Sequence, residues 1–152
     1  MKIISNNKKA SYEYYFLEKF EAGIVLTGTE IKSIRGGKCN IDDAYVSVDG
    51  TYASVIGMNV PKFDNGNIFN HEEKRPRNLL LHKKEMLRIS QKINENGLTV
   101  IPIKVYLDDS GRAKMEIAIA RGKKSYDKRE NIKKRDIERK LQRGDYSWQK
   151  FV

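Results

Sequence analysis

Few side chains in this sequence have the types and spacing that enzyme chemistry requires. The two histidines, His71 and His82, lie at metal-ligand spacing neither from each other nor from the single cysteine, Cys39. We expect each histidine to be a surface or helix-capping residue, and Cys39 to be a small residue in a turn. Neither a GxxxxGK[ST] phosphate loop nor a GxGxxG fingerprint occurs. The sequence therefore predicts a protein without catalytic activity, cofactor or metal site.

Three pairs of adjacent carboxylates are the remaining groups that could do chemistry, because such pairs hold Mg²⁺ in nucleases. They are Asp42–Asp43, Glu72–Glu73 and Asp108–Asp109. All three fall in predicted turns or loops, where acidic residues are common for conformational reasons. A magnesium-dependent RNA-processing enzyme therefore stays open only as a minor alternative.

Basic residues give a stronger pattern, because they gather where predicted strands and helices end. Lysine and arginine at such positions pair with phosphates, and a glycine among them lets RNA approach the backbone. The clusters are Asn7, Lys8 and Lys9; Arg35 and Lys38; Lys74, Arg75 and Arg77; and Arg121, Gly122, Lys123 and Lys124. We expect all four to converge on one edge of the fold and to bind nucleic acid.

The net charge is concentrated at the end of the chain. Of 152 residues, 30 are Lys or Arg and 20 are Asp or Glu, which gives +10. Residues 121–152 hold 12 basic and 5 acidic side chains, or +7, against 18 and 15 in residues 1–120. Their sparse apolar residues cannot offset the entropy of ordering them. We predict a folded body over residues 1–122 and a basic tail over 123–152 that is disordered when free and suited to folding on a partner.

Composition also sets the class of protein. The length fits a single domain with a sizeable core. Neither an apolar run near the ~20 residues of a membrane span nor the apolar stretch of a signal peptide occurs. A single cysteine excludes an internal disulfide. We expect a soluble, cytoplasmic monomer that does not enter a membrane, and the sequence pI near 9.6 indicates a polyanionic partner.

The body is predicted to be mainly β-strand. Ile101, Ile103 and Val105 alternate with other residues, the turn signal at 108–111 follows, and the alternation resumes from Met115 to Ile119. A second hairpin is predicted around Asp49–Gly50, with strands over 45–48 and 51–60. Residues 12–26 are predicted to form one long strand, bent at Gly23.

Two helices are predicted between the strands. The first begins at Thr27, which has capping-box spacing to Glu30, and stops at Gly36–Gly37. The second runs from Lys83 to Asn96, with Gly97 as its C-cap. Residues 61–78 lack periodicity and are predicted to be a mobile loop. Five or six short strands with two packed helices favour an OB-like antiparallel closed barrel with two or three flanking helices; an open α+β sheet is the alternative.

Several motifs in order along the chain resemble the SsrA-binding protein (small protein B) family. The match covers residues 5–140, and so many motifs in sequence make chance similarity implausible. The motifs are Glu21–Ile24, Gly28–Arg35, Asn40–Tyr45, Arg77–His82, Gly122–Lys124 and Asp127–Arg129.

The resemblance implies a fold, a function and partners. The fold is an OB-like barrel with flanking helices. The function is non-catalytic: the protein binds the tRNA-like domain of transfer-messenger RNA and accompanies it to stalled 70S ribosomes in trans-translation. The tail is implied to enter the empty mRNA channel near the decoding site and to become helical there. Alanyl-tRNA synthetase and elongation factor Tu are implied as partners through the RNA.

The resemblance also assigns residues. Its RNA-contacting positions fall on Asn7, Glu21, Leu80, Lys114 and the run Arg121, Gly122, Lys123 and Lys124. Glu21 is expected to accept hydrogen bonds from base amino groups, with a strand-end ion pair as the alternative role. Leu80 is expected to lie against an unstacked base, although a core position remains open for the Leu79–Leu81 run.

In the tail, Asp127, Lys128 and Arg129 match the segment that the family needs for accommodation on the ribosome. The family usually has His before this Asp, whereas this chain has Tyr126, which keeps a flat ring but loses the cationic form. Residues expected to act on the ribosome are Tyr126, Asp127, Lys128, Arg129, Lys133, Lys134 and Arg135. The main hypothesis is thus a ribosome-rescue adaptor, and a ribosomal or ribosome-assembly OB protein is the alternative.

Overall fold

The computed structural model describes residues 1–63, 70–94 and 98–123, and in these ranges it contains seven strands and three helices. The strands are β1 (Lys2–Asn6), β2 (Tyr14–Ile24), β3 (Tyr45–Val48), β4 (Ala53–Ile56), β5 (Arg77–Leu80), β6 (Leu98–Leu107) and β7 (Ala113–Gly122). The helices are α1 (Ala10–Glu13), α2 (Gly28–Arg35) and α3 (Lys83–Ile93).

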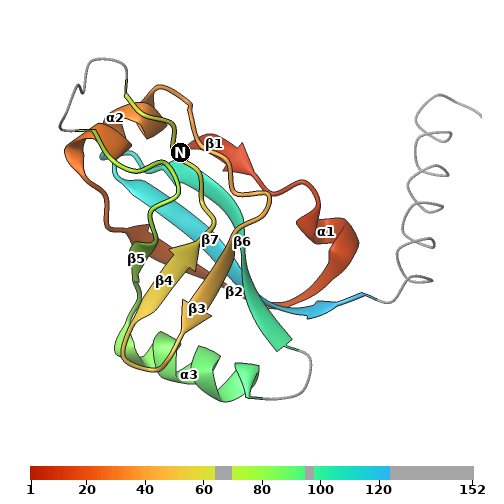
Figure 1. The fold of residues 1–152 in the computed structure, drawn as a ribbon. Helices are drawn as coiled ribbons and strands as arrows, with labels where there is room; N and C mark the ends of the chain where they lie inside the picture. Colours follow the sequence, from red (N-terminus) through yellow and green to blue (C-terminus); the bar gives the residue numbers. More distant parts are fainter. Residues whose placement is uncertain (64–69, 95–97, 124–152) are drawn as a thin grey trace, which may run out of the picture. The chain divides into compact units, whose positions relative to one another are not determined.

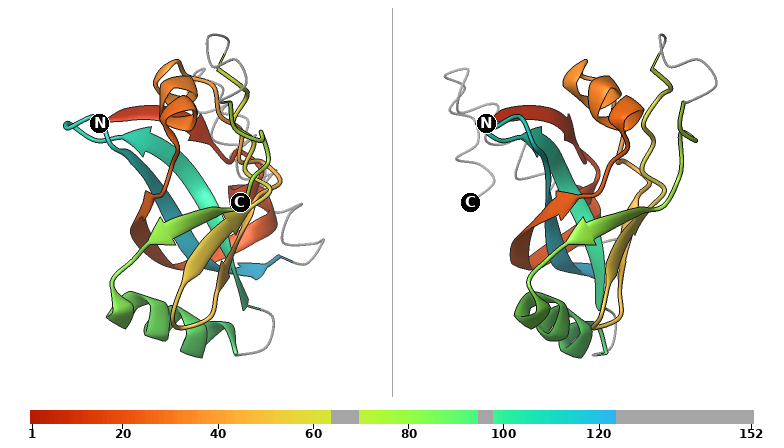
Figure 2. Two further views of the ribbon diagram at one scale, coloured as in Figure 1. Left: turned by 60° about the vertical axis from the view of Figure 1, so that its left-hand side comes forward. Right: turned by 90° about the vertical axis from the view of Figure 1, so that its left-hand side faces the viewer.

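The strands form a closed antiparallel ring, which confirms the predicted barrel. The order is β6, β3, β4, β5, β2 and β7, and the pairing of β7 with β6 closes the ring. β1 pairs with the second half of β6, beside the position where β3 pairs with its first half. Helices α2 and α3 lie at opposite ends of this barrel (Figure 1, Figure 2).

The β6–β7 hairpin forms where the sequence predicts it. The Asp108 carboxylate accepts hydrogen bonds from the backbone N–H groups of Ser110 and Arg112, each at 2.9 Å. Gly111 completes the turn with φ of +78°, a conformation that residues with a Cβ rarely adopt. The second predicted hairpin is also present, as β3 and β4, although β4 covers less than the predicted 51–60.

The prediction of which β6 residues point into the core is wrong for the first half of the strand. Val100 and Val105 lie in the main core, whereas Ile101 packs in a second, smaller cluster with Ala10 and Ala120. The cause is a register shift between Pro102 and Lys104. One extra residue in a strand moves the side chains after it to the opposite face, which simple alternation cannot predict. On β7, which keeps its register, the predicted core face from Met115 to Ile119 is confirmed.

Helix α2 begins at the predicted capping box. The Glu30 N–H donates to Thr27 Oγ1 at 3.4 Å, and Glu30 Oε1 accepts from the Thr27 N–H at 2.8 Å. Helix α3 begins with His82 as N-cap, as expected for this histidine, and ends at Ile93 with Asn94 as C-cap. The predicted end at Asn96 is therefore late, and Gly97 lies outside the described residues.

Three elements are absent from the sequence interpretation. β1 and α1 are short, and β5 falls partly in the segment predicted to be a mobile loop. β5 has only four residues, too few to show periodicity, and its pairing with β4 and β2 stabilises it. The register of β2 shifts between Phe16 and Glu18, which indicates a bulge there, and Gly23 is paired on both sides.

Residues Met1–Gly122 form one compact unit. The predicted tail falls almost entirely outside the described residues, so its disorder when free stays a prediction. In the part of the chain that the structure covers, no helix is both long enough and apolar enough to cross a membrane.

Candidate nucleic-acid interface

Three predicted RNA-contacting residues, distant in sequence, meet on the outer face of the barrel. Gly23 on β2 pairs with Leu80 on β5 at one side and with Lys114 on β7 at the other. Glu21 lies two residues before Gly23 and therefore projects from the same face of β2. A Cβ on Gly23 would lie 3.3 Å from the Leu80 Cβ, so glycine allows β5 to approach. We call Glu21, Gly23, Leu80 and Lys114 the central patch.

Glu21 is held by two neighbours and remains accessible. The Tyr106 hydroxyl donates a hydrogen bond to Glu21 Oε2, and Lys114 Nζ lies 3.9 Å from Oε1. The Glu21 side chain is still 61% exposed, so Oε1 can accept hydrogen bonds from a ligand. Burial, followed by the bond to Glu21, raises the pKa of Tyr106, which keeps its hydroxyl a donor. Glu21 therefore forms an ion pair with Lys114, which was its alternative role, and still exposes its carboxylate to solvent.

Leu80 projects into solvent and not into the core. Its exposed fraction is 64%, whereas that of Leu79 is 4%. The alternation of β5 explains the difference, since adjacent strand residues face opposite sides. The structure thus removes the core alternative for Leu80 and keeps it available for contact with a base.

Two pockets adjoin the central patch, and both are lined by Gly23, Leu80 and Lys114. The α3-side pocket, about 320 Å³, also has Glu21, Leu81, His82 and Glu85 in its wall. The α2-side pocket, about 360 Å³, continues over Ile24, Leu26, Ile31, Arg35, Gly111, Arg112 and Ala113. The first pocket offers carboxylate acceptors, and the second combines an apolar floor with cations.

Arg35 reaches the central patch from helix α2. Its Nη2 donates to the Gly111 carbonyl at 3.0 Å, which fastens the end of α2 to the β6–β7 turn. Its side chain remains exposed at the rim of the α2-side pocket. The predicted residue Arg35 therefore joins Leu80 and Lys114.

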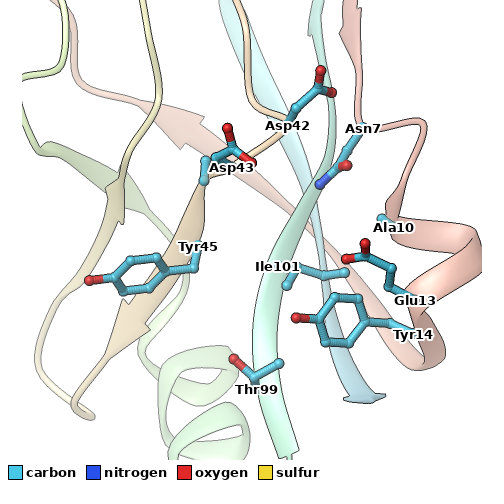
Figure 3. Close-up of a pocket in the computed structure, with 10 residues that line it drawn as sticks. Asn7, Ala10, Glu13, Tyr14, Asp42, Asp43, Tyr45, Thr99 and Ile101 are labelled. Carbon is cyan, nitrogen blue, oxygen red and sulfur yellow. The ribbon is translucent and has the colours of Figure 1, made fainter. Parts of the chain in front are cut away.

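The other predicted residues gather near α1. Asn7 donates from Nδ2 to the Pro102 carbonyl at 3.0 Å, while its buried Oδ1 has no hydrogen-bond partner in the structure. It lines a pocket of about 260 Å³ together with Tyr14, which pairs with Gly122 at the end of β7 (Figure 3). Arg121 places its guanidinium 5.5 Å from the centre of the Tyr15 ring. Lys8 and Lys9 are exposed just before α1, and Lys123 follows β7.

The predicted convergence of four basic clusters on one edge is wrong. Arg35 contacts Gly111 at the turn that precedes β7, whereas Arg121 lies near the other end of that strand. The stretch of strand from Ala113 to Arg121 spans about 26 Å. The described residues therefore form two separate groups, one around Gly23 and one around α1.

The cluster Lys74–Arg77 does not form a basic surface. Arg77 is fully buried, donates from Nε to Oε2 of Glu30, which is also fully buried, and donates from Nη1 to the Met58 carbonyl at 2.8 Å. Arg75 donates from Nη2 to Glu30 Oε1 at 2.6 Å. Both arginines of the cluster thus stabilise the connection between β4 and β5 through Glu30 and backbone carbonyls.

His71 and Cys39 are also structural. His71 is buried, contrary to the predicted surface or capping position, and its ring nitrogens lie 2.9 Å from Thr29 Oγ1 and 2.8 Å from the Val60 carbonyl oxygen. Cys39 packs against the core, and burial raises its pKa to about 12, which makes its thiol a poor nucleophile. Among the described residues, no three His, Cys, Asp or Glu side chains form a possible metal site.

The comparisons with known proteins agree on one family. The family model described as "SmpB protein" matches residues 4–146. This chain belongs to the SsrA-binding protein family. A relative from Thermosipho africanus, an SsrA-binding protein, is 50% identical over 141 residues, which cover 93% of this chain and 95% of the relative. One from Zymomonas mobilis is 49% identical over 138 residues, covering 91% and 86%.

A solved structure described as "tmRNA-SmpB: a journey to the center of the bacterial ribosome" has the same fold. Its TM-score is 0.67 and its identity 36%, over 84% of this chain and 92% of the other. The SmpB family match extends into the tail, and the tail residues predicted to bind RNA or act on the ribosome lie outside the described residues. They are Lys124, Tyr126, Asp127, Lys128, Arg129, Lys133, Lys134 and Arg135, and they stay predictions.

Two further residues lie at the central patch and were not singled out in the sequence. Tyr106 donates to Glu21, and Arg112 lines the α2-side pocket. Neither position carries a local motif. The β6–β7 hairpin brings both near the patch, so only pairing across strands reveals them.

Proposed function

We propose that this chain is an RNA-binding adaptor that binds the tRNA-like domain of transfer-messenger RNA and delivers it to stalled ribosomes. It acts there without catalysing a reaction, in the cytoplasm where ribosomes are found. Membership of the SsrA-binding protein family supports this function and disfavours the ribosome-assembly and RNA-processing alternatives. Alanyl-tRNA synthetase and elongation factor Tu would meet the protein through the same RNA.

The observation that carries the proposal is the central patch. It places a carboxylate with an accessible oxygen, an exposed leucine and a lysine on one face of the barrel. RNA loops are recognised through unstacked bases and through phosphates, and these three groups suit base amino groups, a base face and a phosphate respectively.

The group around α1 has a different composition. Arg121 beside Tyr15 offers a cation next to an aromatic ring, and Lys8 and Lys9 add exposed charges. All of these residues precede the predicted tail in the sequence. We propose that they bind RNA backbone and that residues 123–152 act in the decoding site and mRNA channel.

RNA binding by the body and action of the tail on the ribosome can be tested separately. A variant ending at Gly122 should keep most affinity for a transcript of the tRNA-like domain but lose tagging of nascent chains on stalled ribosomes. Lys114→Ala in the full chain should lower affinity for the same transcript, whereas Lys92→Ala on α3 should not. Loss of all RNA binding by the shortened variant would contradict the assignment of RNA affinity to the body.

A further inference from the structure

The α2-side pocket differs from its neighbour in chemistry. Its lining includes the apolar side chains of Leu26 and Ile31 and the cations Arg35, Arg112 and Lys114. Among the described residues that line it, none is acidic. A pocket lined by apolar side chains and three cations is complementary to an anionic ligand with an apolar face, which describes a nucleotide.

Leu80 stands between this pocket and the α3-side pocket. Both pockets include Leu80 and Lys114 in their walls, and Gly23 beneath them has no side chain to fill the space. Leu80 is 64% exposed, so it projects from the surface between the two hollows. Nucleic-acid-binding proteins use exposed leucines as wedges between successive bases.

The pocket is held in shape by contacts that do not need a ligand. The Arg35–Gly111 hydrogen bond joins α2 to the β6–β7 turn, and the Asp108 carboxylate fixes the backbone of Arg112. Ile31 packs against the core. A preorganised wall reduces the entropy lost when a ligand binds.

We propose that the α2-side pocket binds a second unstacked nucleotide, next to the one whose base faces Glu21, and that Leu80 separates the two bases. The second base lies on Leu26 and Ile31, and its phosphate pairs with Arg112 and Lys114. This inference rests on the proposed function, since it specifies how the same patch holds RNA of the tRNA-like domain.

The test uses the full chain and transcripts of the tRNA-like domain in which unpaired nucleotides are replaced one at a time by 2-aminopurine, whose fluorescence rises when it unstacks. Wild-type protein should brighten two adjacent positions. Arg112→Glu should abolish brightening at one of these positions and lower affinity for the transcript about tenfold at low salt. The slope of log affinity against log salt concentration should become shallower by about one. Lys92→Glu, the same charge change on the far turn of α3, should stay within twofold of wild type.

The second variant is Leu80→Ala. The Leu80 side chain is exposed, so the variant should still fold. Brightening at both positions should fall. Brightening at a single position, or Arg112→Glu with wild-type affinity, would overturn the second subsite while leaving the proposed function intact. Absence of binding by the wild-type chain would instead refute the proposed function.

Discussion

Glu30 on α2 and Arg77 on β5 form an ion pair in which both side chains are fully buried. Arg75 contacts the other Glu30 oxygen, and the remaining Arg77 donors reach backbone carbonyls of Met58, Glu72 and Glu73. This arrangement connects helix α2 to β5 and therefore supports the strand that carries Leu80.

Glu30→Gln should destabilise the protein by about 3–5 kcal/mol, because it leaves the Arg77 charge buried without its partner. Urea denaturation followed by circular dichroism measures the change. Arg88→Ala, which breaks the exposed pair of Arg88 with Glu18, is the matched control and should cost at most about 1 kcal/mol. Equal costs for the two variants would contradict the structural role assigned to Glu30.

Acid should destabilise the wild-type protein partly through the same carboxyl. Burial raises the pKa of Glu30, but hydrogen bonds from Arg75, Thr27 and Arg77 together with the Arg77 charge outweigh it and hold the pKa at about 2, below its ordinary 4.5. A depressed pKa stabilises the fold above about pH 4.5, and that contribution is lost as the pH falls towards 2. Between these values the unfolding free energy of Glu30→Gln should depend on pH less steeply than that of wild type, as urea titrations at each pH would show.

Tyr106→Phe should weaken RNA binding in a protein that still folds. Removing the hydroxyl frees the Glu21 carboxylate to rotate. A hydrogen bond to a charged group contributes about 1.5 kcal/mol, which limits the expected loss of RNA affinity to roughly tenfold. In a Glu21→Ala background the same change should have no further effect on affinity for the tRNA-like domain. Tyr52→Phe, at an exposed tyrosine, is the control. Additive losses from Tyr106→Phe and Glu21→Ala would show that Tyr106 does not act through Glu21.

Cys39 should resist thiol reagents in the folded protein. Burial raises its pKa to about 12, so little thiolate exists at pH 8, despite the opposing effect of the Arg77 charge. Reaction with Ellman's reagent should be at least about tenfold slower in buffer than in 6 M urea, because unfolding restores an ordinary thiol. Equal rates would mean that the Cys39 site opens readily.

Affinity for RNA should fall steeply with salt. If about six phosphates are contacted, a rise from 50 to 200 mM salt should weaken binding by about a thousandfold. Filter binding across this range gives the slope for the full chain and for the chain ending at Gly122. A flat response from the full chain would argue against the exposed cations as phosphate ligands.

Local patterns were sufficient for those elements whose stability depends on neighbours in sequence. The Thr27–Glu30 capping box and the Asp108–Gly111 turn are formed by short-range hydrogen bonds, so the sequence predicts them correctly. The inward face of β6 was not predictable, because the register shift after Pro102 depends on pairing with β7. Strand β5, whose first two residues fall in the predicted loop over 61–78, also depends on long-range pairing, with β4 and β2.

Glu21, Leu80 and Lys114 entered the candidate site through family resemblance, and composition or spacing alone would not have selected them. Arg77 shows the opposite error, since a basic residue in an apparent loop indicated a surface cluster. Its burial depends on Glu30, a partner 47 residues away in sequence. A charge pattern records the number of cations but not whether a carboxylate in the folded chain neutralises them.

The sequence by itself determined the class of protein: mainly β, with a nearly balanced body followed by a strongly basic stretch. These properties follow from composition, alternation and local turn chemistry, which depend only on residue types and on neighbours in the sequence. Only the tertiary structure decided which residues share a surface. Closure of the barrel places Leu80 and Lys114 on either side of Gly23, separates them from Arg121, and buries Arg77 on Glu30. Long-range strand pairing and burial set these relationships, and neither is encoded in the spacing of residues.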